Sequence, residues 1–129
     1  MKKVYTIDTG IYNSAGFKFS GQYGKIMENI VAIKLLRNLS SDSIYYWKDY
    51  QNREVDFAIK INNEIDELIQ VTYSSSYQEI EKREFENLIR AGKELKCSNL
   101  KIITWDYENV RMYGDYEINF TPLWKYLLE

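Results

Sequence analysis

The chain has 129 residues, 45% of them hydrophobic and 28% charged, and these values are typical of one globular domain spanning residues 1–129. The net charge of −2 gives no global electrostatic case for nucleic-acid binding. The absence of histidine and the single cysteine exclude a Ser-His-Asp triad, a Cys-His pair, an ordinary zinc site and an intrachain disulfide. No apolar run is long enough to span a membrane and no signal peptide is visible, so we expect a cytoplasmic protein.

The first predicted elements are a short strand at residues 3–7 and a helix from about Tyr23 to Leu39, separated by a glycine-rich loop that covers residues 13–24. Apolar residues cover most of the circumference of this helix, so we expect it to be largely buried.

Glu28 is the exception on the helix. The residues three, four and seven positions further along are all apolar: Val31, Ala32 and Leu35. A carboxylate on an apolar stripe needs a partner, a proton or a metal. A structural role is equally open, in which Glu28 is stabilised by the helix dipole and pairs with Lys25 or Asn29.

A strand at residues 44–48 leads into a predicted hairpin over residues 53–73. In its first strand, four apolar residues alternate with four others: Val55, Phe57, Ile59 and Ile61 with Glu54, Asp56, Ala58 and Lys60. This period of two predicts one apolar and one polar face. The turn falls at Asn62-Asn63, because asparagine tolerates a positive φ angle.

Pairing of the two hairpin strands can place Asp56 beside Gln70. Carboxylate and amide oxygens are ligands that Mg²⁺ accepts, with Mn²⁺ as a substitute. The alternative interpretation is a half-buried hairpin whose polar face meets water.

The second half of the chain contains one further predicted crossover. The capping-box pattern Ser76-x-x-Glu79 predicts a helix that begins there. The apolar strand at residues 100–105 follows this helix, so we expect it to return to a buried position in the same sheet. Residues 107–111 are polar and predict a loop, and residues 116–120 predict a last short strand.

A terminal helix is predicted to begin at Pro122. Four of its residues are expected to dock it on the core: Leu123, Trp124, Leu127 and Leu128.

The order of these elements, helix, three strands, helix and strand, resembles the restriction-endonuclease-like fold with its PD-(D/E)XK signature. Six segments in sequence, VYTIDTG, GKIMENIVAIKLL, YYWKD, REVDF, LIQVTYS and PLWKYLL, are similar to successive landmarks of one family. This is the uncharacterised C-terminal domain that follows an AAA+ ATPase module in many archaeal and bacterial proteins. The resemblance covers nearly the whole chain and implies an α/β fold, with a mixed central sheet flanked by helices.

The resemblance implies a divalent-metal site in which Asp56, Gln70 and the carbonyl of Val71 hold Mg²⁺, and Glu28 contributes directly or through water. These residues would be the catalytic group of a Mg²⁺-dependent nuclease. An active nuclease of this kind carries a lysine two residues past the Glu/Gln position, where this chain has Thr72.

Lys25 and Lys48 are the candidates for a migrated lysine. Lys25 lies one turn from Glu28, and Lys48 lies on the strand predicted beside that of Asp56.

Two functions follow from these patterns and are left open. One is a nuclease or nuclease-derived nucleic-acid-binding domain, and the other is a non-catalytic module that docks the AAA+ ATPase domain of the same polypeptide. This chain contains no GxxxxGK[ST] loop, so ATP binding is not expected in it.

Overall fold

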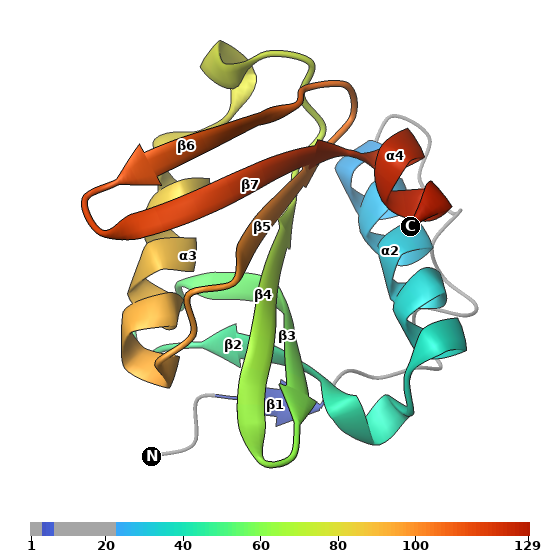
Figure 1. Ribbon diagram of the computed structural model, residues 1–129, viewed down its shortest axis with the longest axis vertical. Helices are drawn as coiled ribbons and strands as arrows, with labels where there is room; N and C mark the ends of the chain where they lie inside the picture. The colour runs from blue at the N-terminus through green and yellow to red at the C-terminus, as the bar shows by residue number, and fades with distance from the viewer. Residues whose placement is uncertain (1–3, 7–22) are drawn as a thin grey trace.

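The computed structural model describes residues 4–6 and 23–129 (Figure 1). Its strands are β1 Val4–Thr6, β2 Ile44–Lys48, β3 Glu54–Ile61, β4 Glu64–Val71, β5 Leu100–Thr104, β6 Asn109–Tyr113 and β7 Tyr116–Pro122. Its α-helices are α2 Tyr23–Asn38, α3 Lys82–Leu95 and α4 Leu123–Leu128. Two single 3₁₀ turns, Ser41–Ser43 and Tyr77–Glu79, precede β2 and α3. Of the loop predicted at residues 13–24, residues 13–22 lie outside the described residues, whereas Tyr23 and Gly24 begin α2.

The strands form one mixed sheet of seven, in the order β1-β2-β3-β4-β5-β7-β6. Strands β1 to β4 pair antiparallel, whereas β5 pairs parallel with both β4 and β7. The predicted crossover through α3 onto β5 is therefore confirmed. So is the α/β class, with its order of helix, three strands, helix and strand.

Helices cover both faces of this sheet, as Figure 1 shows with α2 and α4 on one side and α3 on the other. Residues of α2 and α4 share one apolar core with the sheet, in which Met27, Val31, Leu123 and Tyr126 are buried. Residues of α3 share the second core, where Leu88 and Ala91 are buried. None of the helices in the described part of the chain has the length and apolar character that a membrane span requires.

The faces of the hairpin depart from the prediction because α3 covers the side expected to be wet. Ala58, expected on the polar face, is completely buried. Ile61, expected on the apolar face, is 42% exposed near the turn. The turn itself is confirmed, since Asn62 and Asn63 have φ angles of 54° and 67°.

A register shift between β2 and β3 divides the predicted apolar face. Pairing shifts between Tyr45 and Trp47, where β3 bulges. Val55 consequently belongs to the core under α3, whereas Phe57 belongs to the core under α2.

The helix predicted at Ser76 begins later, and this boundary was wrong. Residues Tyr77–Glu79 form only a 3₁₀ turn, and α3 begins at Lys82. The Ser76 side chain caps nothing, whereas the Glu79 carboxylate accepts a hydrogen bond of 2.8 Å from the Ser75 N–H. The polar pattern therefore closes a turn and does not start the helix.

The predicted loop at residues 107–111 is largely strand β6, which pairs antiparallel with β7. Its polar composition reflects an edge position, and Gly114 closes the turn with a φ of 64°. The terminal helix α4 is confirmed. It docks through Leu123 and Tyr126, whereas three residues expected to dock are exposed: Trp124, Leu127 and Leu128.

Candidate functional site

The site begins where β3 and β4 separate. Pairing runs from the turn, Ile61 opposite Glu64, to Phe57 opposite Ile69, with one register shift between Ile59 and Lys60. Beyond this point the start of β3 pairs with β2, at Val55 opposite Trp47, and the end of β4 pairs with β5. The sheet therefore has a fork between two neighbouring strands.

Side chains bridge this fork. The Asp56 N–H donates to Gln70 Oε1 at 2.9 Å, and the Val71 N–H donates to Asp56 Oδ2 at 2.8 Å. Gln70 Nε2 donates to the Glu54 carbonyl at 3.3 Å. We call these three bonds the Asp56–Gln70 latch. It occupies backbone groups that a continued ladder would have paired.

A pocket of about 440 Å³ opens over the latch. It collects residues from α2, β3, β4, α3 and the segments after β2 and β4, and its lining is Gly24, Lys25, Glu28, Asn52, Glu54, Asp56, Gln70, Val71, Thr72, Tyr73, Arg83, Glu84 and Asn87. The structure thus brings together the four predicted site residues: Glu28, Asp56, Gln70 and Val71.

The two candidate lysines differ in position. Lys25 lines the pocket, and its Nζ lies 3.7 Å from Glu28 Oε2, which is the ion pair that the structural interpretation of Glu28 predicts. Lys48 does not line the pocket, and its Nζ lies 3.7 Å from Glu54 Oε1. Thr72 lines the pocket at the position where the resemblance would place a lysine.

Two carboxyl groups in the pocket have raised pKa values. Burial raises the pKa of Asp56 well above its ordinary value, the nearby charges of Glu28 and Glu84 raise it further, and the Val71 N–H and Lys25 oppose this rise. Burial also raises the pKa of Glu84, against the opposing charge of Arg83. Both groups therefore bind their proton more tightly than exposed carboxyls do.

Glu84 was missed in the sequence analysis. It lies on α3, interacts electrostatically with Glu28 across the pocket and forms a side-chain hydrogen bond with Gln70. A signal was present, since Glu84 precedes the buried Leu88 by four residues and Ala91 by seven. That spacing places a carboxylate on the apolar stripe of a helix, as it does for Glu28.

The donor set does not fit a divalent-metal centre as arranged here. The described residues contain no group of three Asp, Glu, Cys or His side chains placed to hold a metal ion. The Gln70 amide is hydrogen-bonded to the β3 backbone through both its oxygen and its nitrogen. Asp56 Oδ2 already accepts a hydrogen bond from the Val71 N–H. A metal bound by Gln70 Oε1 and Asp56 Oδ2 would compete with the bonds that close the fork, which leaves Asp56 Oδ1 as the oxygen of the two side chains that no bond of the latch uses.

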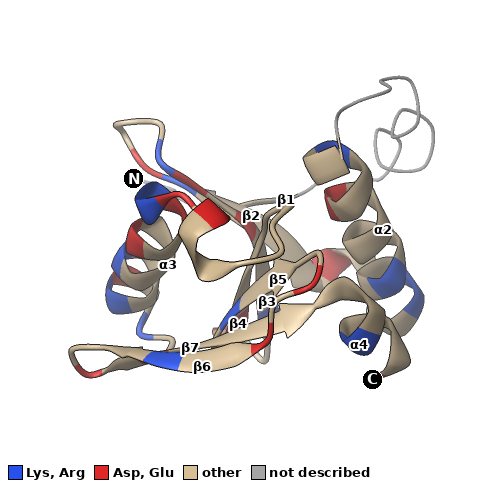
Figure 2. Ribbon diagram, turned by 90° about the horizontal axis from the view of Figure 1, so that it is seen from above, with Lys and Arg blue, Asp and Glu red and all other residues tan. Residues whose placement is uncertain are grey.

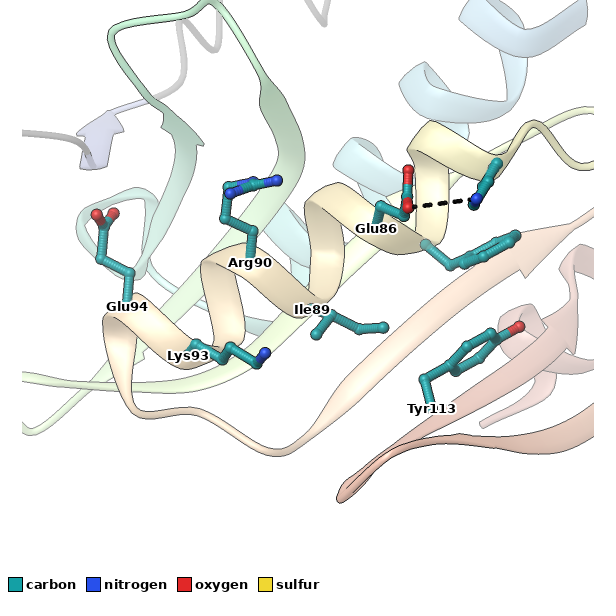
Figure 3. Close-up of a pocket in the computed structure, with 8 residues that line it drawn as sticks. Glu86, Ile89, Arg90, Lys93, Glu94 and Tyr113 are labelled. Carbon is teal, nitrogen blue, oxygen red and sulfur yellow. Dashed lines mark ion pairs between the residues drawn. The ribbon is translucent and has the colours of Figure 1, made fainter.

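A larger cavity, of about 720 Å³, lies elsewhere, between the outer face of α3 and Tyr113 of β6 (Figure 3). Figure 2 shows basic and acidic segments alternating along this helix. The ion pair of Glu86 with Lys82, 3.9 Å long, is drawn dashed in Figure 3. Glu94 in turn accepts a 2.7 Å hydrogen bond from Trp47 Nε1. None of the predicted site residues lines this groove.

Comparison with family models gives a match over residues 23–126 to DUF4143, a domain of unknown function. The chain belongs to this family. DUF4143 domains are found with AAA-type ATPases, which agrees with the ATPase association expected from the sequence. Neither the comparison with curated proteins nor that with solved structures gives a match.

Proposed function

We propose that this DUF4143 chain is a nuclease-like module without hydrolytic activity, which docks an AAA-type ATPase domain. The observation that carries this proposal is the Asp56–Gln70 latch. Two of the three side chains expected to hold the metal, Asp56 and Gln70, are engaged with strand backbone, at 2.8–3.3 Å. The association of the family with AAA-type ATPases supports the choice of partner.

The residue at position 72 supports the same conclusion. Threonine cannot carry a positive charge to a phosphate or lower the pKa of a water molecule. Lys25 is the lysine that lines the described pocket, and it is already paired with Glu28 at 3.7 Å. The pocket is thus poorly equipped to stabilise the charge that develops in phosphodiester hydrolysis.

The absence of hydrolytic activity is tested by a cleavage assay on single- and double-stranded DNA and RNA with Mg²⁺ or Mn²⁺. We expect the parent and Asp56→Asn to give the same background. Cleavage by the parent that Asp56→Asn abolishes would contradict the proposal.

The docking function is tested by calorimetric titration of the chain with the AAA-type ATPase module of a protein of this family. We expect saturable binding of one module per chain. An absence of binding at concentrations up to about 100 μM, which corresponds to less than about 5.5 kcal/mol, would count against docking.

Metal-dependent hydrolysis is the second candidate, because Glu28, Asp56 and Gln70 line one pocket although they are distant in the chain. Its sharpest test restores the signature with the double variant Gln70→Glu/Thr72→Lys. If the pocket is a metal site that lacks only these groups, the double variant gains Mn²⁺-dependent cleavage and the parent has none. Cleavage by the parent itself would favour this candidate outright.

A further inference from the structure

Three exposed aromatic side chains form a row beside the pocket. Tyr23, Tyr73 and Trp105 are 54%, 50% and 49% exposed. The Tyr23 and Tyr73 rings stack with centroids 4.9 Å apart, and the Tyr73 and Trp105 rings are tilted with centroids 6.0 Å apart. We call these residues the aromatic row. Large aromatic groups exposed together on a surface are typical of interaction sites.

The row adjoins two elements that line the pocket, because Tyr23 begins α2 and Tyr73 follows the end of β4. Tyr73 lines the pocket, and Tyr23 is the neighbour of Gly24, which also lines it. The backbone behind Trp105 is fixed, because its N–H donates to the Ser74 carbonyl at 2.9 Å. The row and the pocket therefore adjoin through Tyr73, and the hydrogen bond at Trp105 lowers the entropic cost of ordering that end of the row on binding.

The charges of the pocket indicate what this surface accepts. Its lining holds four carboxylates, Glu28, Glu54, Asp56 and Glu84, against two cations, Lys25 and Arg83. Glu28 and Glu54 have ion pairs with Lys25 and Lys48. Arg83 Nε pairs with Glu81 Oε2 at 2.7 Å. Within the described residues, Asp56 and Glu84 are left without an ion pair.

We propose that the pocket and the aromatic row together bind a basic, apolar segment of a partner protein, with an arginine or lysine side chain entering the pocket between Asp56 and Glu84. This rests on the proposed docking function and names the chemistry of the partner. A guanidinium can donate to two carboxylates at once, and apolar residues that flank it on the partner would cover the rings of the row.

Single-stranded nucleic acid is the main competing occupant, because bases stack on exposed aromatic rings. The lining of the pocket opposes it. A lining with four carboxyl groups and two cations offers a phosphate backbone little positive charge, whereas proteins that bind nucleic-acid single strands line the path of the backbone with positive charge.

The test uses two amidated peptides, one with an arginine between two leucines and one with glutamate in place of the arginine. Binding to the chain is measured by calorimetry, and by nuclear magnetic resonance shifts of the Trp105 side chain. We expect the arginine peptide to bind at least about tenfold more tightly than the glutamate peptide, and its affinity to fall as salt is raised.

Matched variants locate the binding. Glu84→Gln and Trp105→Ala should each weaken the arginine peptide by about tenfold. Two control variants should change the affinity for the arginine peptide by less than about twofold. They are Glu86→Gln, on the same helix but outside this pocket, and Trp124→Ala, exposed on α4. Circular dichroism melting checks that all four variants fold.

Three results would overturn the inference. They are no binding of the arginine peptide, equal binding of both peptides, and tighter binding of a single-stranded oligonucleotide than of the arginine peptide. If the ATPase module binds but Glu84→Gln and Trp105→Ala leave that binding unchanged, docking uses another surface and this inference alone fails. If the peptide binds and the ATPase module does not, the docking function fails and this surface stands.

Discussion

The two ends of the β3–β4 hairpin hold their strands together by different means. At the closed end, Asn62 and Asn63 adopt positive φ angles and the backbone ladder starts at once, with Ile61 opposite Glu64. At the open end the ladder stops at Phe57 and Ile69, and side chains take over the pairing. One end is held by local conformation, and the other by two residues fourteen positions apart.

The difference shows why the open end has a polar pocket. A ladder satisfies its own N–H and C=O groups and leaves side chains to face the helices. A fork requires buried polar side chains, and these bring titratable groups such as Asp56 near the charges of α2 and α3. The polarity of the site is therefore partly a structural requirement of the fold.

The largest expected effect is at the open end. Gln70→Ala would leave the Asp56 N–H and the Glu54 carbonyl without their partners, so we expect a loss of about 3 kcal/mol in the free energy of unfolding. Urea denaturation measures it, with exposed Gln78→Ala as the control. A loss no larger than that of the control would mean that the latch does not hold the fork.

The closed end should respond less. Asn63→Val places a β-branched residue at a φ of 67°, and we expect it to cost about 1–2 kcal/mol. The same denaturation series measures it. A cost larger than that of Gln70→Ala would reverse the comparison between the two ends.

Removing the charge of Asp56 should change the free energy of unfolding by a smaller amount, and should raise it. Because burial raises its pKa in the folded state, the folded protein binds this proton more tightly than the unfolded chain. The contribution of the Asp56 carboxyl to the free energy of unfolding is therefore fully present below the ordinary aspartate pKa. It is lost as the pH rises through the raised pKa of the folded state. The carboxyl faces Glu28 and Lys25 of α2 and Glu84 of α3.

Asp56→Asn keeps an oxygen for the Val71 N–H and removes the charge, so we expect it to stabilise the protein at pH 7 by about 1 kcal/mol. The gain should shrink as the pH falls toward 4. Denaturation of both proteins across this pH range measures it. A gain that stays constant with pH, or a loss at pH 7, would contradict the assignment.

The smallest effect is Asn63→Gly. Glycine adopts the left-handed conformation without strain, so we expect a stabilisation of up to about 0.5 kcal/mol, visible as a small rise in the melting temperature. A clear loss would indicate that the Asn63 side chain stabilises the turn through contacts of its own.

Local patterns predicted the parts of the fold that local physics decides. The helix expected from about Tyr23 to Leu39 is α2, Tyr23–Asn38, and the Asn62-Asn63 turn is present. Strand β6 was missed because an edge strand needs only β7 as a partner and can be polar on both sides.

The candidate site was predicted in part, and from the family resemblance instead of from local patterns. The placement of Glu28, Asp56 and Gln70 in one pocket follows from the order of elements that the resemblance supplied. The latch could not be predicted, because it depends on where β3 and β4 separate, which is set by the partners β2 and β5. Glu84 reaches the pocket through the packing of α3 against the sheet, and its position on the apolar stripe of that helix was the sequence signal for it. The metal-ligand and catalytic roles of these residues remain predictions.

The most direct test of the account is a Mn²⁺ titration of the parent chain and Asp56→Asn, followed by the melting temperature. If Asp56 and Gln70 close the fork and do not ligate metal, Mn²⁺ shifts the two melting temperatures equally or not at all. A rise of several degrees in the parent alone, saturating with Mn²⁺, would show a specific metal site at Asp56 and contradict the account.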